Sequence, residues 1–339
     1  MKKFIDSNAL FKVLIPVSWK HSLMDSNIHN FQEYEIWKSD AFQISIKDIQ
    51  RDEDRKRFNE MLKHGSICKI GNQEYFSLPD VVHKEGITKI WTRLFGDKRV
   101  LFTLTHLNGG SGEKELGIAP LSQRLRIAKE VISSFELIDR SMSKQVLNSY
   151  RFEIFLQGFG ASIFMLNKAI ENKSFIEAVC ILASQIDSSL RIAIILREQI
   201  LNKNKDIQDK WIYQGEYDGK ISERTIYKEA RNLEIIDGDI FNKLNELYNH
   251  RNRIIHRFII SEITLAEVEE IAFRYYKMRT LLDKIVYNLE SEQIKLKVGM
   301  TIKEDKGDKS SVKKTLDFTL GKIGKIDYFD DHEYISKDK

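Results

Sequence analysis

Two kinds of hydrophobic periodicity divide the chain into halves. In the first 120 residues, apolar and polar positions alternate, and many of the apolar positions hold β-branched or aromatic residues. A period of two with such residues predicts β-strands. The strands predicted in this way cover residues 11–15, 41–47, 87–95 and 99–107. Pro120 then precedes apolar residues at helical spacing as far as Phe135, so we expect an antiparallel sheet closed by a helix.

Helical spacing dominates the second half, which contains none of the three prolines. The predicted helices cover residues 146–171, 174–203, 222–235, 239–258 and 264–295. Ser174 with Glu177, and Thr264 with Glu267, match the S/T-x-x-E pattern of a capping box. This pattern predicts where two of the helices begin.

The fold class predicted by these patterns is α+β, with an N-terminal antiparallel sheet and packed helices followed by an all-α bundle. We place the two domains at residues 1–140 and 141–296. Residues 297–339 are predicted to form a charged C-terminal tail. The apolar residues near its end either form a short strand or remain flexible, so part of the tail can be ordered.

Composition narrows the classes of protein that fit. Hydrophobic residues make up 42% of the chain and charged residues 31%, which is typical of a globular protein. The net charge of +4 is too small to indicate nucleic-acid binding, so any polyanion site must be local. Cys68 and Cys180 lack metal-binding or disulfide spacing, and no metalloprotease motif is present. We therefore expect no cofactor, and a cytoplasmic protein without a membrane segment.

One motif carries candidate chemistry. Residues 247–261 read LYNHRNRIIHRFIIS, in which four residues separate Arg251 from His256. The same residue types recur at wider spacing in residues 57–64 and 99–106, but the first match lies in a charged run and the second on a predicted strand. Only the Arg251 match ends a long predicted helix and has asparagine directly after the arginine.

This RN-x3-H string follows the segments ASQIDSSLRIAIILREQI and SERTIYKEARNLEII on earlier predicted helices. Together they resemble the HEPN superfamily of helical ribonucleases over residues 146–295. The resemblance implies metal-independent RNA cleavage, in which the ribose 2′-hydroxyl attacks the adjacent phosphate. It also implies that Arg251, Asn252 and His256 are catalytic. An imidazole exchanges protons near neutral pH, a guanidinium holds developing phosphorane charge, and the amide orients the phosphate or ribose.

Other polar residues of this region have supporting roles in the same interpretation. His250, Arg253 and Arg257 are candidates for binding the flanking RNA. On an ideal helix, Arg251 falls within an apolar stripe, and a buried guanidinium requires a counter-ion or a cleft. Asp187 is a candidate for that support, although it can equally be the counter-ion of an arginine on its own helix. The stripe consists of Leu244, Leu247, Tyr248, Ile254, Ile255 and Phe258.

Helical geometry also predicts the oligomeric state. Arg251 and His256 diverge by about 140° on an ideal helix, so one chain does not easily bring both side chains to one phosphate. The HEPN resemblance implies a dimer with a composite site, which solves this problem. We therefore expect a homodimer formed through the helical domain.

The first half suggests a regulatory unit. Its segments FKVLIPVSWK, EYEIWKSDAFQISI, VLFTLTHL and VISSFELID resemble the PsbP-like α+β fold. This resemblance implies a sensing domain that receives a protein or ligand trigger. Trp19, Trp37 and Trp91 are predicted to be core residues rather than pocket residues.

The leading hypothesis is a HEPN endoribonuclease that cleaves RNA as a defence or toxin-type effector. The alternative is a non-catalytic HEPN-like module for dimerisation or ligand binding, in which Arg251 and His256 only hold helices together. A third possibility is an adaptor whose partner docks on the sheet.

Overall fold

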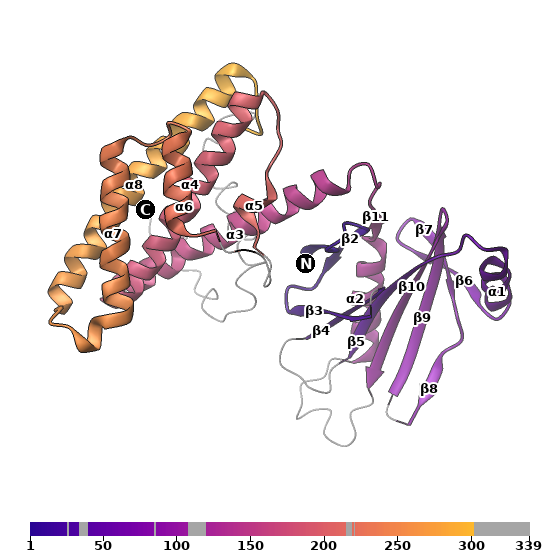
Figure 1. Cartoon of the computed structure of the whole chain (residues 1–339). Coiled ribbons are helices and arrows are strands. Elements are labelled where there is room, and N and C mark those ends of the chain that lie inside the picture. The colour runs from indigo at the N-terminus through magenta and orange to yellow at the C-terminus, as the bar shows by residue number, and fades with distance from the viewer. Residues whose placement is uncertain are drawn as a thin grey trace, which may run out of the picture. The chain divides into compact units, whose positions relative to one another are not determined.

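The computed structural model describes residues 1–301, except residues 26, 34–39, 85, 108–119, 215–218 and 220. Within this part, the chain forms two compact units, residues 1–143 and the residues from 144 onward (Figure 1). We call them the N-terminal and C-terminal units. Trp37 and nearly all of the predicted tail lie outside the described residues.

The N-terminal unit contains two antiparallel sheets within its described residues. The smaller sheet has the order β1-β2-β11 and consists of β1 (Lys2–Ile5), β2 (Phe11–Ile15) and β11 (Glu136–Leu137). The larger sheet has the order β3-β4-β5-β10-β9-β7-β6, and β8 also pairs with β9. Its strands are β3 (Trp19–Asp25), β4 (Ile28–Glu33), β5 (Ala41–Asp48), β6 (Ser66–Ile70), β7 (Gln73–Ser77), β8 (Val81–His83), β9 (Gly86–Phe95) and β10 (Lys98–Leu107).

The core of this unit lies between the sheets and α2 (Leu121–Ser133), which contacts β2, β6 and β10. Every second residue of β10 is buried from Val100 onward, as the alternating pattern predicted. Phe102 lies opposite Trp91 on one side and Ile44 on the other, so three central strands contribute to one apolar layer. The predicted strands and the core position of Trp91 are confirmed, whereas α1 (Asp52–Leu62) was not predicted.

The C-terminal unit is helical, which confirms the α+β class. Its elements are α3 (Ser143–Glu171), α4 (Phe175–Asn202), α5 (Asp209–Ile212), α6 (Glu223–Asn232), α7 (Gly238–Arg257), the 3-10 turn η1 (Phe258–Ile260) and α8 (Leu265–Leu296). The capping box predicted at Thr264 is present. The one predicted at Ser174 is wrong, because Ser174 does not adopt the extended backbone of a capping residue and its side chain makes no cap bond.

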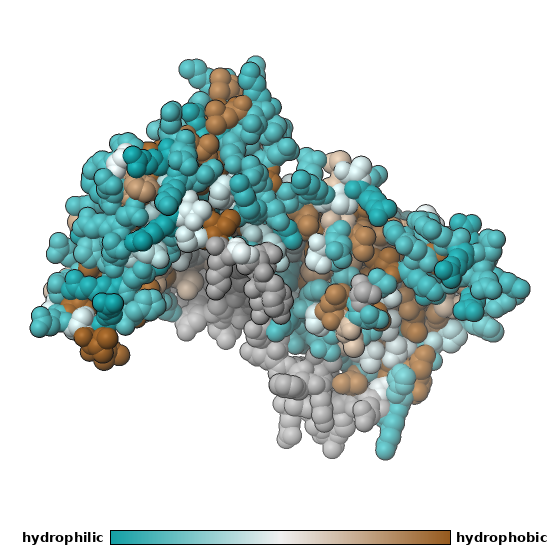
Figure 2. Space-filling view, in the orientation of Figure 1, coloured by the Kyte–Doolittle hydropathy of each residue, from teal (hydrophilic) through white to brown (hydrophobic). Residues whose placement is uncertain are grey.

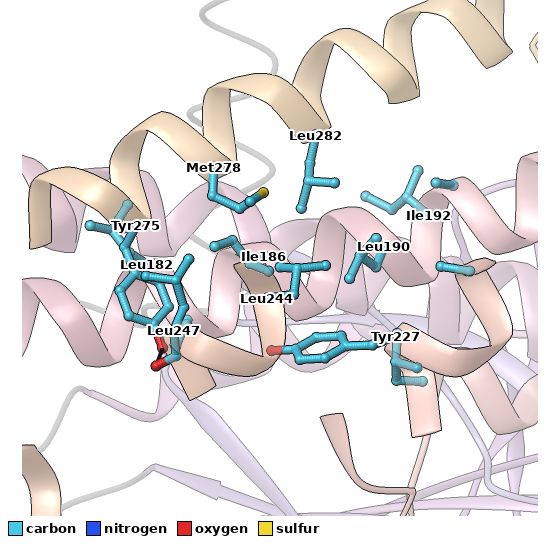
Figure 3. Packing of buried hydrophobic residues seen from close by; sticks show 14 of the residues in the cluster. Leu182, Ile186, Leu190, Ile192, Tyr227, Leu244, Leu247, Tyr275, Met278 and Leu282 are labelled. Carbon is cyan, nitrogen blue, oxygen red and sulfur yellow. Dashed lines mark hydrogen bonds between the residues drawn. The ribbon is translucent and has the colours of Figure 1, made fainter. Parts of the chain in front are cut away.

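Helix α4 forms the centre of the C-terminal unit. It packs along α8 and also contacts α6 and α7, and its buried residues Leu182, Ile186 and Leu190 meet Leu244 and Leu282 (Figure 3). By length and composition alone, α4 could cross a membrane, but 78% of its most apolar window is buried inside the unit. A helix that is apolar on all sides is expected at the core of a bundle.

Candidate active site on helices α6 and α7

Three buried apolar side chains fix the rotation of α7 in the bundle. Leu244, Leu247 and Ile254 face the core. Ile255, which the predicted stripe included, is 45% exposed, because the neighbouring Ile254 occupies the core-facing position of the last turns. This rotation places Arg251 at the border of the core, next to α6.

Arg251 is held by a carboxylate of α6. Its side chain is 17% exposed and Nη1 forms an ion pair with Glu223. Nη2 donates to Asn252 Oδ1 at 3.0 Å, and the guanidinium carbon lies 4.9 Å from the ring centre of Tyr248. Burial lowers the pKa of Arg251, but the Glu223 carboxylate more than offsets this effect, so the net pKa is raised. The guanidinium is therefore charged and positioned before any ligand binds.

Asp187 is not the counter-ion of Arg251. Asp187 Oδ2 accepts from Arg191 Nε at 2.6 Å, and Arg191 also donates to the carbonyl of Trp211 at 3.0 Å. Burial raises the pKa of Asp187, while the charges of Arg191 and Arg251 oppose this shift. Asp187 thus takes the alternative role proposed from the sequence, that of partner to an arginine one turn away on its own helix.

The remaining predicted residues fall into two groups. His256 and Arg257 are exposed at the end of α7, and their side chains make no hydrogen bond or ion pair with other described residues. Arg253 is also exposed, and its Nη2 lies 3.8 Å from Glu267. His250 instead belongs to a network between α7 and α8, because its Nε2 lies 3.4 Å from Glu246 Oε1 and 3.4 Å from Arg274 Nη1.

Sequence reasoning missed the residues that α6 contributes. Glu223 accepts from the Tyr227 hydroxyl at 3.2 Å through the oxygen that does not bind Arg251. Burial raises the pKa of Tyr227, so the phenol keeps its proton and can donate it to this bond. Arg224 lies beside them, with its guanidinium carbon 4.6 Å from the ring centre of Tyr248. The sequence signal was Ser222 directly before the acidic Glu223, a pattern typical of a helix start.

The structure therefore brings Arg251 and Asn252 together, whereas the His256 side chain is exposed and forms no hydrogen bond with either of them. Among the described residues, no group of three or more His, Cys, Asp or Glu side chains could hold a metal ion. The arrangement offers a fixed cation, an amide and, further along α7, an imidazole open to solvent. These groups match the needs of anion binding and proton transfer.

Comparisons with known proteins give little further information. No family model and no curated protein matches the chain. Among solved structures, it is similar to a protein from Bacteroides thetaiotaomicron VPI-5482, with 15% identity and a TM-score of 0.31 over 54% of this chain and 76% of that one. It is also similar to the solution structure of PsbP (CyanoP) from Synechocystis sp. PCC 6803, with 13% identity and a TM-score of 0.27 over 40% of this chain and 92% of that one. Likenesses at this level assign neither a family nor a function.

Proposed function

We propose that the protein is a metal-independent endoribonuclease of the HEPN type, with Arg251, Asn252 and His256 as catalytic residues. The observation that supports this proposal best is the composition of the end of α7. There, the Arg251 guanidinium is held by a counter-ion and hydrogen bonds to the Asn252 amide. The exposed imidazole of His256 follows in the next turn of the helix. We further propose that the N-terminal unit senses a trigger, as in a defence or toxin-type effector acting in the cytoplasm.

The proposed reaction is an internal transfer at phosphorus. The ribose 2′-hydroxyl loses its proton to a base and attacks the adjacent phosphorus, and the 5′-oxygen of the next nucleotide leaves with a proton from an acid. The products are a 2′,3′-cyclic phosphate and a 5′-hydroxyl end. His256 serves as the acid or the base, and Arg251 holds the negative charge that develops on the phosphorane oxygens.

A second copy of the chain completes the site in this proposal. Arg251 faces α6 whereas His256 is open to solvent, in keeping with a divergence of about 140° along α7. Ile259 and Ile260 in the following turn are 94% and 82% exposed, and Figure 2 shows a hydrophobic protrusion at this end of the unit. Exposed apolar side chains next to a functional residue support association at this point.

Cleavage of single-stranded RNA by the full chain in EDTA tests the proposal. Arg251→Ala and His256→Ala are each expected to lower the rate at least about a hundredfold. A mixture of the two variants is expected to recover part of the activity, because a composite site can combine one intact residue from each protomer. RNA with 2′-deoxyribose at the cleaved position should resist.

Matched controls come from the N-terminal unit. Arg57 and His64 are the same residue types at a similar spacing, and both are exposed on or next to α1. Arg57→Ala and His64→Ala should leave the rate unchanged. Equal activity of the wild type and the two α7 variants would rule out the catalytic assignment.

The second candidate is a non-catalytic module for association. It is favoured by the ion pair of Arg251 with Glu223, which already neutralises the guanidinium, and by the exposed isoleucines of η1. A chain that forms dimers by light scattering but leaves RNA intact, with and without EDTA, would support this candidate instead.

A further inference from the structure

The junction of α6 and α7 repeats one arrangement of side chains. Arg224 Nη2 donates to Asn249 Oδ1 at 2.8 Å, and Arg251 Nη2 donates to Asn252 Oδ1 at 3.0 Å. The two guanidinium carbons lie 4.6 and 4.9 Å from the ring centre of Tyr248. The two cations are therefore less than about 10 Å apart, and both contact one aromatic ring.

The two arginine–asparagine pairs differ in their counter-ions. Arg251 is paired with Glu223, whereas Arg224 is exposed and has no carboxylate partner in the part of the chain that the structure describes. Each asparagine directs its oxygen toward its arginine, which leaves its NH2 group without a partner among the described residues. The Tyr248 ring stabilises both cations but neutralises neither, so this surface has excess positive charge and unused N–H donors.

We propose that the surface formed by Arg224, Asn249, Tyr248, Arg251 and Asn252 binds two neighbouring phosphates of single-stranded RNA, one at each arginine–asparagine pair. The inference rests on the proposed function and assigns Arg224, Tyr248 and Asn249 to substrate binding. Guanidinium and amide N–H groups are suitable donors to phosphate oxygens. Two cations near each other favour a ligand with repeated negative charge over a single carboxylate. Phosphate contacts of this kind do not distinguish between bases, so binding should be largely independent of the RNA sequence.

The test is binding of a fluorescent single-stranded 2′-O-methyl RNA to the full chain, measured by anisotropy at several salt concentrations. This probe lacks the nucleophilic hydroxyl and stays intact. Arg224→Ala is expected to weaken binding about tenfold, because a charge-assisted contact is lost. It should also lower the slope of log affinity against log salt by about 0.7, as expected for one phosphate contact to a single strand.

Arg231→Ala is the matched control. Arg231 lies on the same helix and also stacks on an aromatic ring of α7, with its guanidinium carbon 5.0 Å from the centre of the Phe241 ring. It is exposed and stacks on Phe241 rather than on Tyr248, so RNA binding by Arg231→Ala should stay at the wild-type level. Arg224→Lys keeps the charge without the planar fork, so it should restore the salt slope more fully than the affinity.

The outcomes separate this inference from the proposed reaction. Equal binding by Arg224→Ala and Arg231→Ala would overturn the inference, while the cleavage experiment would still decide the reaction. A wild-type chain that does not bind the probe would overturn it as well. A chain that binds with the expected loss at Arg224 but does not cleave RNA would support the binding surface and exclude the nuclease.

Discussion

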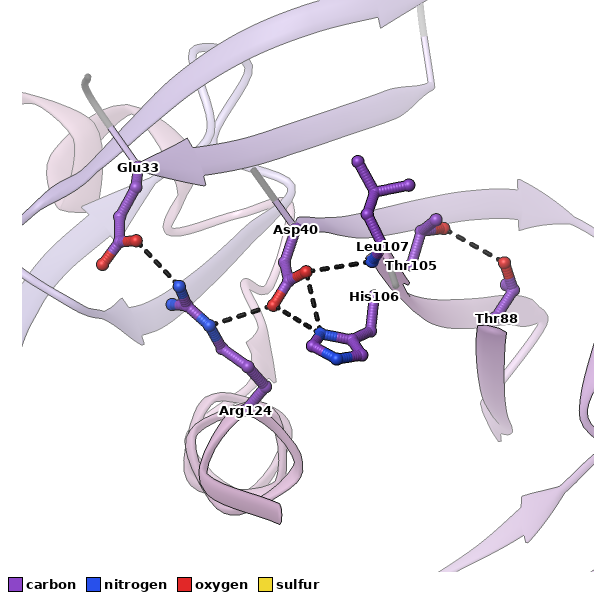
Figure 4. A network of polar contacts seen from close by, with 7 residues as sticks. All are labelled: Glu33, Asp40, Thr88, Thr105, His106, Leu107 and Arg124. Carbon is purple, nitrogen blue, oxygen red and sulfur yellow. Dashed lines mark hydrogen bonds and ion pairs between the residues drawn. The ribbon is translucent and has the colours of Figure 1, made fainter. Parts of the chain in front are cut away.

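A buried charge network in the N-terminal unit allows a sharp prediction about stability. Asp40, just before β5, accepts from His106 Nδ1 at 2.9 Å and from the backbone amide of Leu107 at 3.2 Å (Figure 4). Arg124 of α2 lies with Nε 2.9 Å from Asp40 and donates from Nη2 to Glu33 at 2.8 Å. The network thus joins β4, β5 and β10 to the helix that covers them. The side chains of Asp40, His106 and Arg124 are all nearly inaccessible to solvent.

Replacing Asp40 by alanine leaves the other members buried without their shared acceptor. Breaking a buried ion pair by removing one partner costs about 3–5 kcal/mol. Because Arg124 keeps Glu33, we expect about 3 kcal/mol for Asp40→Ala. Asp48, at the other end of β5, is the matched control, since it also forms an ion pair, with Lys98. Its side chain is 56% exposed, against 5% for Asp40, so Asp48→Ala should cost less than about 1 kcal/mol.

Hydrogen exchange measured by mass spectrometry on the full chain can resolve this difference within the N-terminal unit. For Asp40→Ala, the slowest amides of β5 and β10 should exchange about a hundredfold faster than in the wild type, since 1.4 kcal/mol corresponds to a factor of ten. Asp48→Ala should change them less than about fivefold. Peptides of α4 serve as an internal reference. Similar exchange in the two variants would refute the claim that burial makes the Asp40 network costly to break.

Two further predictions concern other sites. Burial and the neighbouring His29 imidazole lower the pKa of His21 to about 4 from its usual 6.5, so its stabilising contribution is intact above pH 6.5 and is lost as the pH falls toward 4. Urea unfolding should show that His21→Gln removes about 2 kcal/mol of the acid destabilisation between pH 7 and pH 4.5, and an unchanged pH dependence would count against this. Gly299 has φ +77°, and a Cβ there would lie 2.2 Å from the buried Gln293 side chain. Gly299→Ala should therefore lower the local stability at the end of α8 by at least about 2 kcal/mol, as measured by hydrogen exchange. Gly96→Ala should cost less, because Gly96 has φ +62° but open space around it.

The sequence predicted the strands, helices and ion pairs whose pattern lies within one short segment of the chain. Alternation in β10 and helical spacing in α4 are local patterns, so their elements were found. The ion pair of Asp187 with Arg191 was also among the predictions, because it joins residues one helical turn apart. Strands β1, β3, β4, β6, β7, β8 and β11 lie outside the four predicted strand ranges. In β8, for example, two adjacent valines give no alternation and all three residues are exposed.

The partner of Arg251 shows why the site itself was harder to predict. The sequence indicated that a guanidinium in the apolar stripe needs a counter-ion, and the structure provides one. That counter-ion is Glu223, which lies 28 residues away on another helix. Its identity depends on how α6 packs against α7, which no spacing within one segment specifies. Arg224 and Asn249 escaped notice for the same reason, and Tyr248 was predicted only as a member of the apolar stripe.

On the proposed function, RNA binding at the α6–α7 junction and proton transfer by His256 are separate tasks, and this division favours a dimer. Both arginine–asparagine pairs lie at the junction of α6 and α7, so a bound strand would follow this junction. The His256 side chain is exposed near the end of α7 and forms no hydrogen bond or ion pair with either arginine–asparagine pair. On an ideal helix His256 diverges from Arg251 by about 140°, so we expect the imidazole that serves a phosphate at Arg251 to come from a second chain. The exposed isoleucines of η1 provide an apolar surface at which a second protomer can bring its own His256 to that phosphate. Substitutions at Ile259 should thus lower the rate of cleavage without weakening RNA binding at Arg224. If the site were complete within one chain, the same substitutions would change neither the cleavage rate nor the binding.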